Sequence, residues 1–448
     1  MRLFRLFLAI ALCLAPIAVP AQKKPATLVI ISVDGMKPEY ATRADEHGLK
    51  VPVLRSFLKD GTYAEGVIGV IPTVTYPSHT TLVTGVWPAE HGVIDNTIFD
   101  PERIHPDVWY WDFQDIKVPT LYTQAKAAGL KTAAVSWPVT VGAPIDYLVA
   151  EGMQSEHTDT PSGSPYNPAD IMTQLHVTRT RESYPDTAKT ETAVGILHKF
   201  HPNLMLVHLT DLDHQEHQHG PFSPEANAAM EILDSQIGQI EKAALEVDPS
   251  ARIAVVSDHG FMPIHHRVNL DVLLVQAGLI TLKPEKAAAL PKGESPVRFW
   301  QAAGWGANGS MAIVLRDPKD KVVLAKVKAI LDKAAADPAN GIAEVIAQPE
   351  LTRRGGFPQA SFLVDFKSGY QPGSALQEPL VVDSTDLGAH GYLPTHPEVR
   401  STFMVKGSGV AAGRDLKIID MRQIAPTFAQ MLGITLPAAK LPPVAVKP

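Results

Sequence analysis

Residues 27–35 read TLVIISVDG, an uninterrupted apolar run that ends on Asp34 and Gly35. Similar apolar runs recur further along the chain, at residues 132–135, 204–209, 253–256 and 402–405. Stretches with helical periodicity separate them, at residues 120–128, 224–247 and 421–432. Continuous apolar strands that alternate with helices are typical of a mainly parallel sheet with helices on both faces. We therefore expect an α/β fold.

Acidic residues follow several of these predicted strands. Asp34 ends the first run, Asp213 comes shortly after the run at 204–209, and Asp258 follows the run at 253–256. In open α/β sheets, ligands bind at the carboxyl ends of the strands. The sequence therefore predicts a functional site at this edge of the sheet.

The stretch from residue 282 to 373 interrupts the alternation. It contains a strand-like run at 310–315, a helix-like run at 321–335 and short strand-like runs near 342–346 and 361–366. We expect a smaller inserted α+β subdomain here, bordering the substrate pocket. The catalytic domain then comprises residues 22–281 and 374–436, and residues 437–448 form a proline-rich tail.

The N-terminus has the pattern of a signal peptide. Arg2 and Arg5 precede the apolar residues 6–21, and small residues before Gln22 suit cleavage. The run is short for a membrane span of about 20 residues, although an uncleaved anchor remains the alternative. We expect residues 1–21 to be removed, no stable membrane anchor, and a periplasmic or secreted protein.

Composition narrows the chemistry further. Cys13, inside the expected signal peptide, is the only cysteine, so the mature chain has no thiol for a nucleophile, a disulfide or a metal ligand. The formal net charge is −7 and there is no basic block, so a nucleic-acid polymer is not the expected partner. Any metal must be bound by His, Asp or Glu.

Three motifs combine Asp and His in patterns that suit metal binding. Asp213 and His217 are four residues apart, which places them on one face of a helical turn. Asp258 and His259 are adjacent, and His390 precedes a glycine. Each motif alone could equally be a solvated loop. Together, at the ends of predicted strands, they indicate a metal site.

A threonine-rich segment, PTVTYPSHTTLVTG at residues 72–85, completes the set. Pro77 suits the first turn of a helix, so Thr75 lies at the helix start, beside unpaired N–H groups and the positive end of the helix dipole. That position favours an alkoxide and a bound phosphate. Local sequence leaves two interpretations open, a nucleophile and a simple helix cap.

This segment, together with residues 87–92 (WPAEHG) and Asp95-Asn96, resembles the nucleophile region of nucleotide pyrophosphatase/phosphodiesterases of the alkaline phosphatase superfamily. The remaining motifs follow in that family's order and span nearly the whole mature chain: Asp34-Gly35, Ser136-Trp137-Pro138, residues 213–217, residues 257–260 and residues 390–392. The resemblance implies an alkaline-phosphatase-like fold.

The resemblance also implies two divalent metal ions, for which zinc suits the His and carboxylate ligands, without excluding manganese or iron. By that pattern, one metal has the ligands Asp213, His217 and His390. The other has Asp34, Thr75, Asp258 and His259. Thr75 would attack phosphorus to give a phospho-threonine intermediate, and Asn96 would donate a hydrogen bond to a phosphoryl oxygen.

For the substrate, the resemblance implies a small phosphodiester or nucleotide. Cysteine-type sulfatases are excluded because their nucleophile derives from a cysteine, which the mature chain lacks. The Trp137-Pro138 motif resembles the diesterase branch, whereas threonine-type alkaline phosphatases carry a Lys-x-Arg pair there. Tyr76 matches a base-stacking position, although a buried ring under the helix start is the alternative. Tyr166 is a second candidate for the opposite side of the base.

Several alternatives remain open. A phosphomonoesterase, a lipid-headgroup diesterase or a phosphonate hydrolase could use the same metal site, because Ser78, Val139 and Thr140 depart from the family pattern on the substrate side. An inactive nucleotide- or metal-binding sensor is less compatible with a complete ligand set. A mutase related to phosphoglycerate mutases would use a serine and a large insertion that does not fit between Thr75 and Asn96. The sequence does not predict the oligomeric state.

Overall fold

The structure is a computed structural model that describes residues 25–105, 108–151, 164–178, 184–284, 293–377 and 379–447. The expected signal peptide, residues 1–21, lies outside the described residues.

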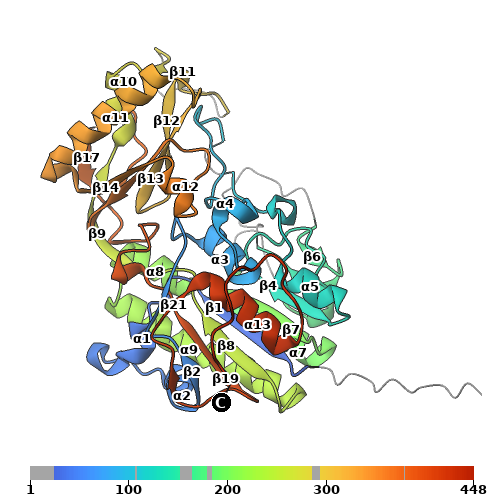
Figure 1. The fold of residues 1–448 in the computed structure, drawn as a ribbon. Coiled ribbons are helices and arrows are strands. Elements are labelled where there is room, and N and C mark those ends of the chain that lie inside the picture. Colours follow the sequence, from blue (N-terminus) through green and yellow to red (C-terminus); the bar gives the residue numbers. More distant parts are fainter. Residues whose placement is uncertain are drawn as a thin grey trace, which may run out of the picture.

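A nine-stranded sheet forms the centre of the molecule (Figure 1). Its strands, in spatial order, are β20 (Arg414–Asp415), β2 (Gly61–Tyr63), β19 (Phe403–Gly407), β8 (Arg252–Val256), β1 (Leu28–Val33), β7 (Leu204–Leu209), β4 (Thr132–Val135), β5 (Tyr147–Val149) and β6 (Tyr166–Asn167). The run from β8 to β5 is parallel throughout, and β19 and β6 pair antiparallel beside it. The expected mainly parallel sheet is therefore confirmed.

The central strands of the sheet bury both of their faces. In β1, Leu28 and Ile30 belong to one hydrophobic core, and Val29 and Ile31 belong to another. The first core is covered by helices α3 (Thr75–Thr84), α5 (Leu121–Ala127) and α13 (Ile424–Leu432). The second is covered by α2 (Pro52–Asp60), α7 (Asp186–Phe200) and α9 (Pro224–Val247). This two-sided burial explains the continuous apolar runs in the sequence.

A smaller lobe stands at one end of the main sheet (Figure 1). Its four-stranded antiparallel sheet has the order β12 (Ala302–Gly306), β13 (Ser310–Leu315), β15 (Phe362–Phe366) and β14 (Ile342–Ala347), with α11 (Lys321–Ala336) packed against it. The hydrophobic core of this lobe extends beyond residues 282–373. It also takes in β9 (Met262–Val268), α10 (Leu270–Gln276) and residues as far as Val399.

The C-terminal segment packs onto the main core. Val444 and Val446 are buried in the first core. The Val444 N–H donates to Thr427 Oγ1 at 2.9 Å, and the Ala411 N–H donates to the Val446 carbonyl at 2.8 Å. Across the described residues, no helix is both long and apolar enough to cross a membrane.

Candidate active site

The carboxyl ends of the central strands bring the Asp and His motifs together. Asp34 directly follows β1, and Asp258 follows β8 by two residues. Asp213 and His217 lie on α8 (Asp211–His219), which begins soon after β7, and His390 follows the short strand β18 (Gly388–Ala389). The topology of the parallel sheet thus explains why motifs distant in sequence share one place.

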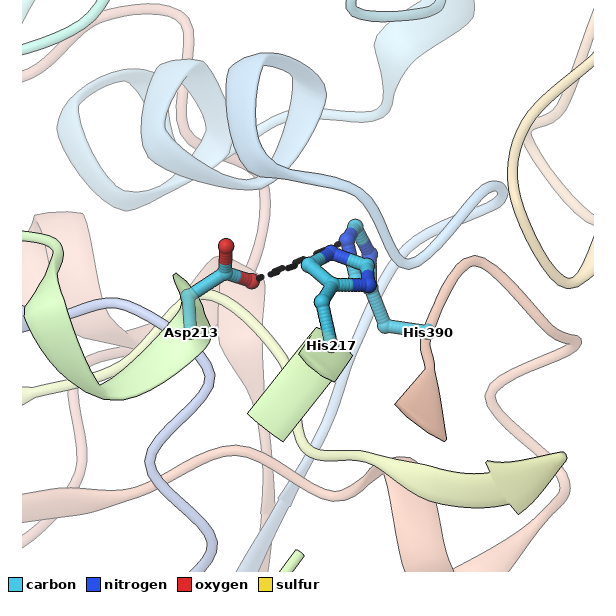
Figure 2. Close-up of side chains that lie close together, drawn as sticks. All are labelled: Asp213, His217 and His390. Atoms are coloured by element: carbon cyan, nitrogen blue, oxygen red, sulfur yellow. Dashed lines mark ion pairs between the residues drawn. The ribbon is translucent and has the colours of Figure 1, made fainter. Parts of the chain in front are cut away.

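Asp213, His217 and His390 form the first group, with one ligand atom from each within 4.8 Å of the others (Figure 2). Asp213 Oδ1 lies 3.6 Å from His217 Nε2 and 3.8 Å from His390 Nε2. The Nδ1 atoms face backbone carbonyls, of Gly388 at 3.1 Å and of Thr73 at 3.2 Å. Because a carbonyl only accepts, both Nδ1 atoms carry the proton, and the lone pairs are on the Nε2 atoms, of which that of His390 also lies 3.1 Å from Asn308 Nδ2.

Asp34, Asp258 and His259 form the second group, again within 4.8 Å. His259 Nε2 lies 3.3 Å from Asp34 Oδ1 and 3.1 Å from Asp258 Oδ2. The rings of His259 and His390 stack at 3.6 Å between centroids and 5° between planes, so the two groups are neighbours. The family resemblance implies the same division into two groups, with Thr75 as a further member of the second.

The polar atoms of both groups fit a bound divalent cation. Among the described residues, Asp34 Oδ1, Asp213 Oδ1, Asp258 Oδ2 and His259 Nε2 are buried without a hydrogen-bond partner. Burying carboxylates without compensation is costly. Carboxylate oxygens and imidazole nitrogens that converge in this way are ligands suited to zinc or a similar metal.

Burial also changes the protonation of these carboxylates. It raises the pKa of Asp258 to about 7 and that of Asp213 to about 6, with nearby carboxylates adding to the effect. The pKa of Asp34 rises well above its ordinary value for the same reasons. Burial lowers the pKa of His259, and that of His390 falls well below its usual range. Both imidazoles are therefore neutral at pH 7, the form that binds metals.

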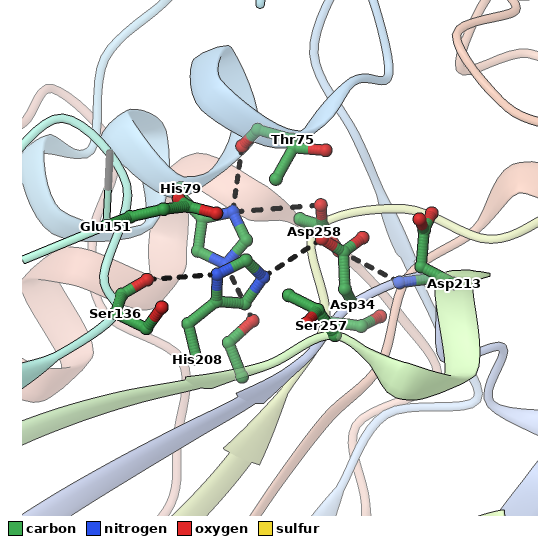
Figure 3. A network of polar contacts seen from close by, with 12 residues as sticks. Asp34, Thr75, His79, Ser136, Glu151, His208, Asp213, Ser257 and Asp258 are labelled. Carbon is green, nitrogen blue, oxygen red and sulfur yellow. Dashed lines mark hydrogen bonds and ion pairs between the residues drawn. The ribbon is translucent and has the colours of Figure 1, made fainter. Parts of the chain in front are cut away.

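A second layer of polar side chains supports the second group (Figure 3). His208 Nε2 lies 2.9 Å from Asp34 Oδ2, and its Nδ1 lies 3.1 Å from the Ser136 carbonyl. The Gly35 N–H donates to Asp258 Oδ1 at 3.2 Å. His208 is not among the site residues predicted from the sequence. The sequence feature that could have indicated its role is a histidine inside the apolar run 204–209.

Thr75 is the first residue of α3, and Val74 occupies the N-cap position without a side-chain cap. His79 fixes this first turn, because its Nδ1 lies 2.8 Å from the Thr75 carbonyl and its Nε2 lies 2.9 Å from Ser32 Oγ. The Thr75 side chain is thus not needed to cap the helix from the N-cap position. In Figure 3 the Thr75 side chain lies above Asp258, on the side of the polar network that is away from the sheet strands.

Asn96 lies beside the start of α3. Its Oδ1 accepts the N–H of Tyr76 at 2.8 Å. Because that N–H can only donate, the carbonyl end of the amide must face Tyr76, and the NH₂ end is the part that can serve as a donor. This orientation is the one required of a group that donates to a phosphoryl oxygen.

The two tyrosines lie in different settings. Tyr76 is 1% exposed. Its ring meets Trp109 edge-on, and its hydroxyl donates to Glu151 at 3.2 Å. That arrangement matches the packing alternative, a buried ring under the helix start, rather than a face open to a base. Tyr166 lies in edge strand β6, partly buried against the second core.

The smaller lobe packs closely against the loop that carries His390. Ser310 Oγ donates to the Gly391 carbonyl at 2.7 Å. A Cβ on Gly391 would lie 1.7 Å from the Ala307 carbonyl oxygen, and one on Gly309 would lie 2.4 Å from the Tyr392 ring. The turn between β12 and β13 therefore touches the backbone next to a candidate metal ligand.

Comparisons with known proteins agree with this fold. Residues 28–393 match the family described as type I phosphodiesterase / nucleotide pyrophosphatase. The chain belongs to this family, as the motifs predict. Human ectonucleotide pyrophosphatase/phosphodiesterase family member 1 is 26% identical over 254 residues, which are 54% of this chain and 24% of the human protein. An uncharacterized pyrophosphatase/phosphodiesterase of Schizosaccharomyces pombe is 26% identical over 53% of this chain and 45% of its own length. The chain thus spans less than half the length of these relatives.

Solved structures show the same fold. Human ectonucleotide pyrophosphatase/phosphodiesterase 5 has a TM-score of 0.64 and 20% identity, covering 91% of this chain and 95% of the human chain. An inactive threonine-to-alanine variant of the murine protein, in complex with AMP, also has a TM-score of 0.64, with 19% identity and coverage of 94% and 97%. The expected alkaline-phosphatase-like α/β fold is confirmed.

The raised pKa of Asp258 predicts how the metal-free protein responds to pH. Between about pH 4 and pH 7 the unfolded chain has released a proton that the folded chain still holds at Asp258, so folding stability falls as pH rises through this window. Asp258→Asn mimics the protonated group. We expect EDTA-treated Asp258→Asn to resist urea better than EDTA-treated wild type at pH 7, with the difference shrinking toward pH 4.

The control is Asp383→Asn, whose side chain is 96% exposed and should leave the urea midpoint unchanged. Equal stabilities of Asp258→Asn and wild type at pH 7 would show that the buried carboxylate carries no such penalty. Zinc content, measured on the same variants before the EDTA treatment, should fall in Asp258→Asn alone.

Proposed function

We propose that this protein is an exported, metal-dependent phosphodiesterase or nucleotide pyrophosphatase that uses Thr75 as its nucleophile. The observation that carries the proposal is the pair of converging Asp/His groups beside the start of α3. The family of the chain agrees with it, as do the relatives' names, which include a venom phosphodiesterase of Macrovipera lebetinus.

The proposed mechanism assigns a task to each residue. Asp213, His217 and His390 would hold one divalent cation, and Asp34, Thr75, Asp258 and His259 the other. When bound, these ions, most suitably zinc, supply positive charge that lowers the pKa of a hydroxyl and stabilises a leaving oxygen. The Thr75 hydroxyl loses its proton and attacks phosphorus in line. The bond to the leaving oxygen breaks, that oxygen takes up a proton, and water then releases the phosphoryl group from Thr75.

Asn96 and the helix start would stabilise charge on the phosphoryl oxygens. The NH₂ of Asn96 and the backbone N–H of Thr75 at the N-terminus of α3 form an oxyanion-type site. Because Asn96 is fixed by its bond to the Tyr76 N–H, it is oriented before substrate binds. Preorganised donors of this kind stabilise charge without further reorganisation.

A nucleotide-type diester is the substrate class that we propose. The Trp137-Pro138 motif resembles the diesterase branch, and the complex of a murine relative contains AMP. The site residues come from both the main sheet and the loop of His390. We propose export because residues 1–21 have the signal-peptide pattern and the relatives include ectoenzymes by name.

The proposal is tested with purified, zinc-loaded protein and three chromogenic esters: bis-p-nitrophenyl phosphate, p-nitrophenyl phosphate and thymidine 5′-monophosphate p-nitrophenyl ester. We expect both diesters to be hydrolysed faster than the monoester, and the thymidine ester fastest. Thr75→Ala should lower kcat by about 10³-fold or more, because the nucleophile is lost. Preference for the monoester would instead indicate a phosphatase.

Thr75→Ser is the matched control, since it keeps a hydroxyl at the same position and should retain part of the activity. Zinc content and thermal unfolding of Thr75→Ala should stay close to wild type. A Thr75→Ala variant that keeps wild-type kcat with intact metal content contradicts the assignment of the nucleophile.

Asn96→Asp separates the two roles of this side chain. Aspartate can still accept from the Tyr76 N–H but cannot donate to a phosphoryl oxygen. We expect kcat on the thymidine ester to fall about 100-fold or more, with an unchanged urea midpoint. Unchanged kcat would show that Asn96 serves only to hold the start of α3.

A further inference from the structure

A cavity of about 550 Å³ lies between the segment after Asn96 and the smaller lobe. This volume is within the range of small-molecule sites, about 300–1,000 Å³. Its lining includes Thr97, Arg103, Arg267, Asp271, Gly306 and Asn308.

The cavity adjoins the candidate active site on the side of His390. Asn308, at the turn between β12 and β13, lines the cavity and places its Nδ2 3.1 Å from His390 Nε2. Thr97, which follows Asn96, lines it too, and its carbonyl accepts the Trp305 Nε1–H at 3.2 Å. Asn308 thus connects this cavity to the candidate ligand His390.

The cations of the cavity are already paired. Arg103 donates to Asp271 at 2.6 Å, and Asp271 also accepts the Gly304 N–H at 2.9 Å. Arg267 donates to Asp386 at 2.7 Å. Each of these charged side chains lines the cavity.

Asp100 adds a further carboxylate to the lining, and its Oδ2 accepts the backbone N–H of His105 at 2.6 Å. Carboxylates thus outnumber guanidinium groups. A leaving group with several phosphate charges would meet like charge here. The remaining polar lining consists of hydroxyl and amide groups such as Thr97, Asn308 and Gln371, which suit hydroxyl-bearing ligands.

We propose that this cavity is the leaving-group subsite and that it takes an uncharged, hydroxyl-bearing alcohol of about nucleoside size. The assignment rests on the proposed function, and it narrows the substrate to diesters between a nucleotide and such an alcohol. It also gives the smaller lobe a role in specificity, because Gly304, Gly306 and Asn308 line the cavity.

Gly306 offers a way to fill the cavity without straining the chain. The nearest atom to a Cβ added there is Met311 Cε at 3.9 Å, an ordinary contact distance. Gly306→Leu should therefore fold normally and occupy space in the cavity. The two substrates share the retained AMP and differ in the leaving alcohol: adenylyl-(3′→5′)-adenosine releases adenosine, and the methyl ester of AMP releases methanol.

We expect Gly306→Leu to lower kcat/KM for adenylyl-adenosine at least about tenfold relative to wild type, and to leave the methyl ester within about twofold. Gly306→Ala is the matched control and should resemble wild type on both substrates. An equal change on both, or on neither, overturns the subsite while leaving the proposed function intact. If the wild type hydrolyses neither ester, the proposed function and the subsite are both overturned.

A charge variant tests the chemical class of the leaving group. Asp386→Asn removes the negative charge that pairs with Arg267, so the positive charge of the guanidinium at the cavity is no longer neutralised by this partner. We expect kcat/KM for ATP, which releases pyrophosphate, to rise about five- to tenfold relative to that for adenylyl-adenosine. An unchanged ratio would show that an anionic leaving group does not contact this cavity. If the wild type instead prefers a choline ester of AMP over adenylyl-adenosine, the leaving group that the cavity takes is a cationic alcohol and not a neutral one.

Discussion

The structure depends on burying several carboxylates at one edge of a parallel sheet. Asp34, Asp213 and Asp258 converge there, and each has a carboxylate oxygen that no hydrogen bond satisfies among the described residues. A protein interior does not tolerate such a concentration of negative charge unless protons or cations compensate it. The raised pKa values of these groups and their suitability as metal ligands are two consequences of the same burial.

The neighbouring polar residues orient this charge. His208 faces Asp34, His79 connects the first turn of α3 to Ser32, and the Thr73 carbonyl fixes the tautomer of His390. Each of these contacts joins elements that are distant in the sequence. Side chains held by several packed elements in this way have little freedom to move, so the candidate ligand atoms are oriented by the fold itself.

Much of the fold and the grouping of the Asp and His side chains could be predicted because their signals are local. Residues 27–35 combine a buried strand with a ligand, and Asp213 and His217 share a helical turn, so pattern and chemistry coincide. His208 and Asn308 were not predictable in this way, because their roles depend on which side chains the packed sheet and the β12–β13 turn bring to the site. For Tyr76, sequence left stacking and packing open, and the buried ring is decided by Trp109, a partner 33 residues away.

The contact between the β12–β13 turn and the loop of His390 means that the smaller lobe is not a removable module. The turn and the loop meet through Ser310 Oγ and the Gly391 carbonyl, with no room for a side chain at Gly391. A shortened protein that kept only the main sheet would lose the support of one candidate metal ligand, His390. Substitutions in the smaller lobe are therefore constrained by its contact with the candidate site. New specificities must arise through changes that preserve the contact between the β12–β13 turn and the loop of His390.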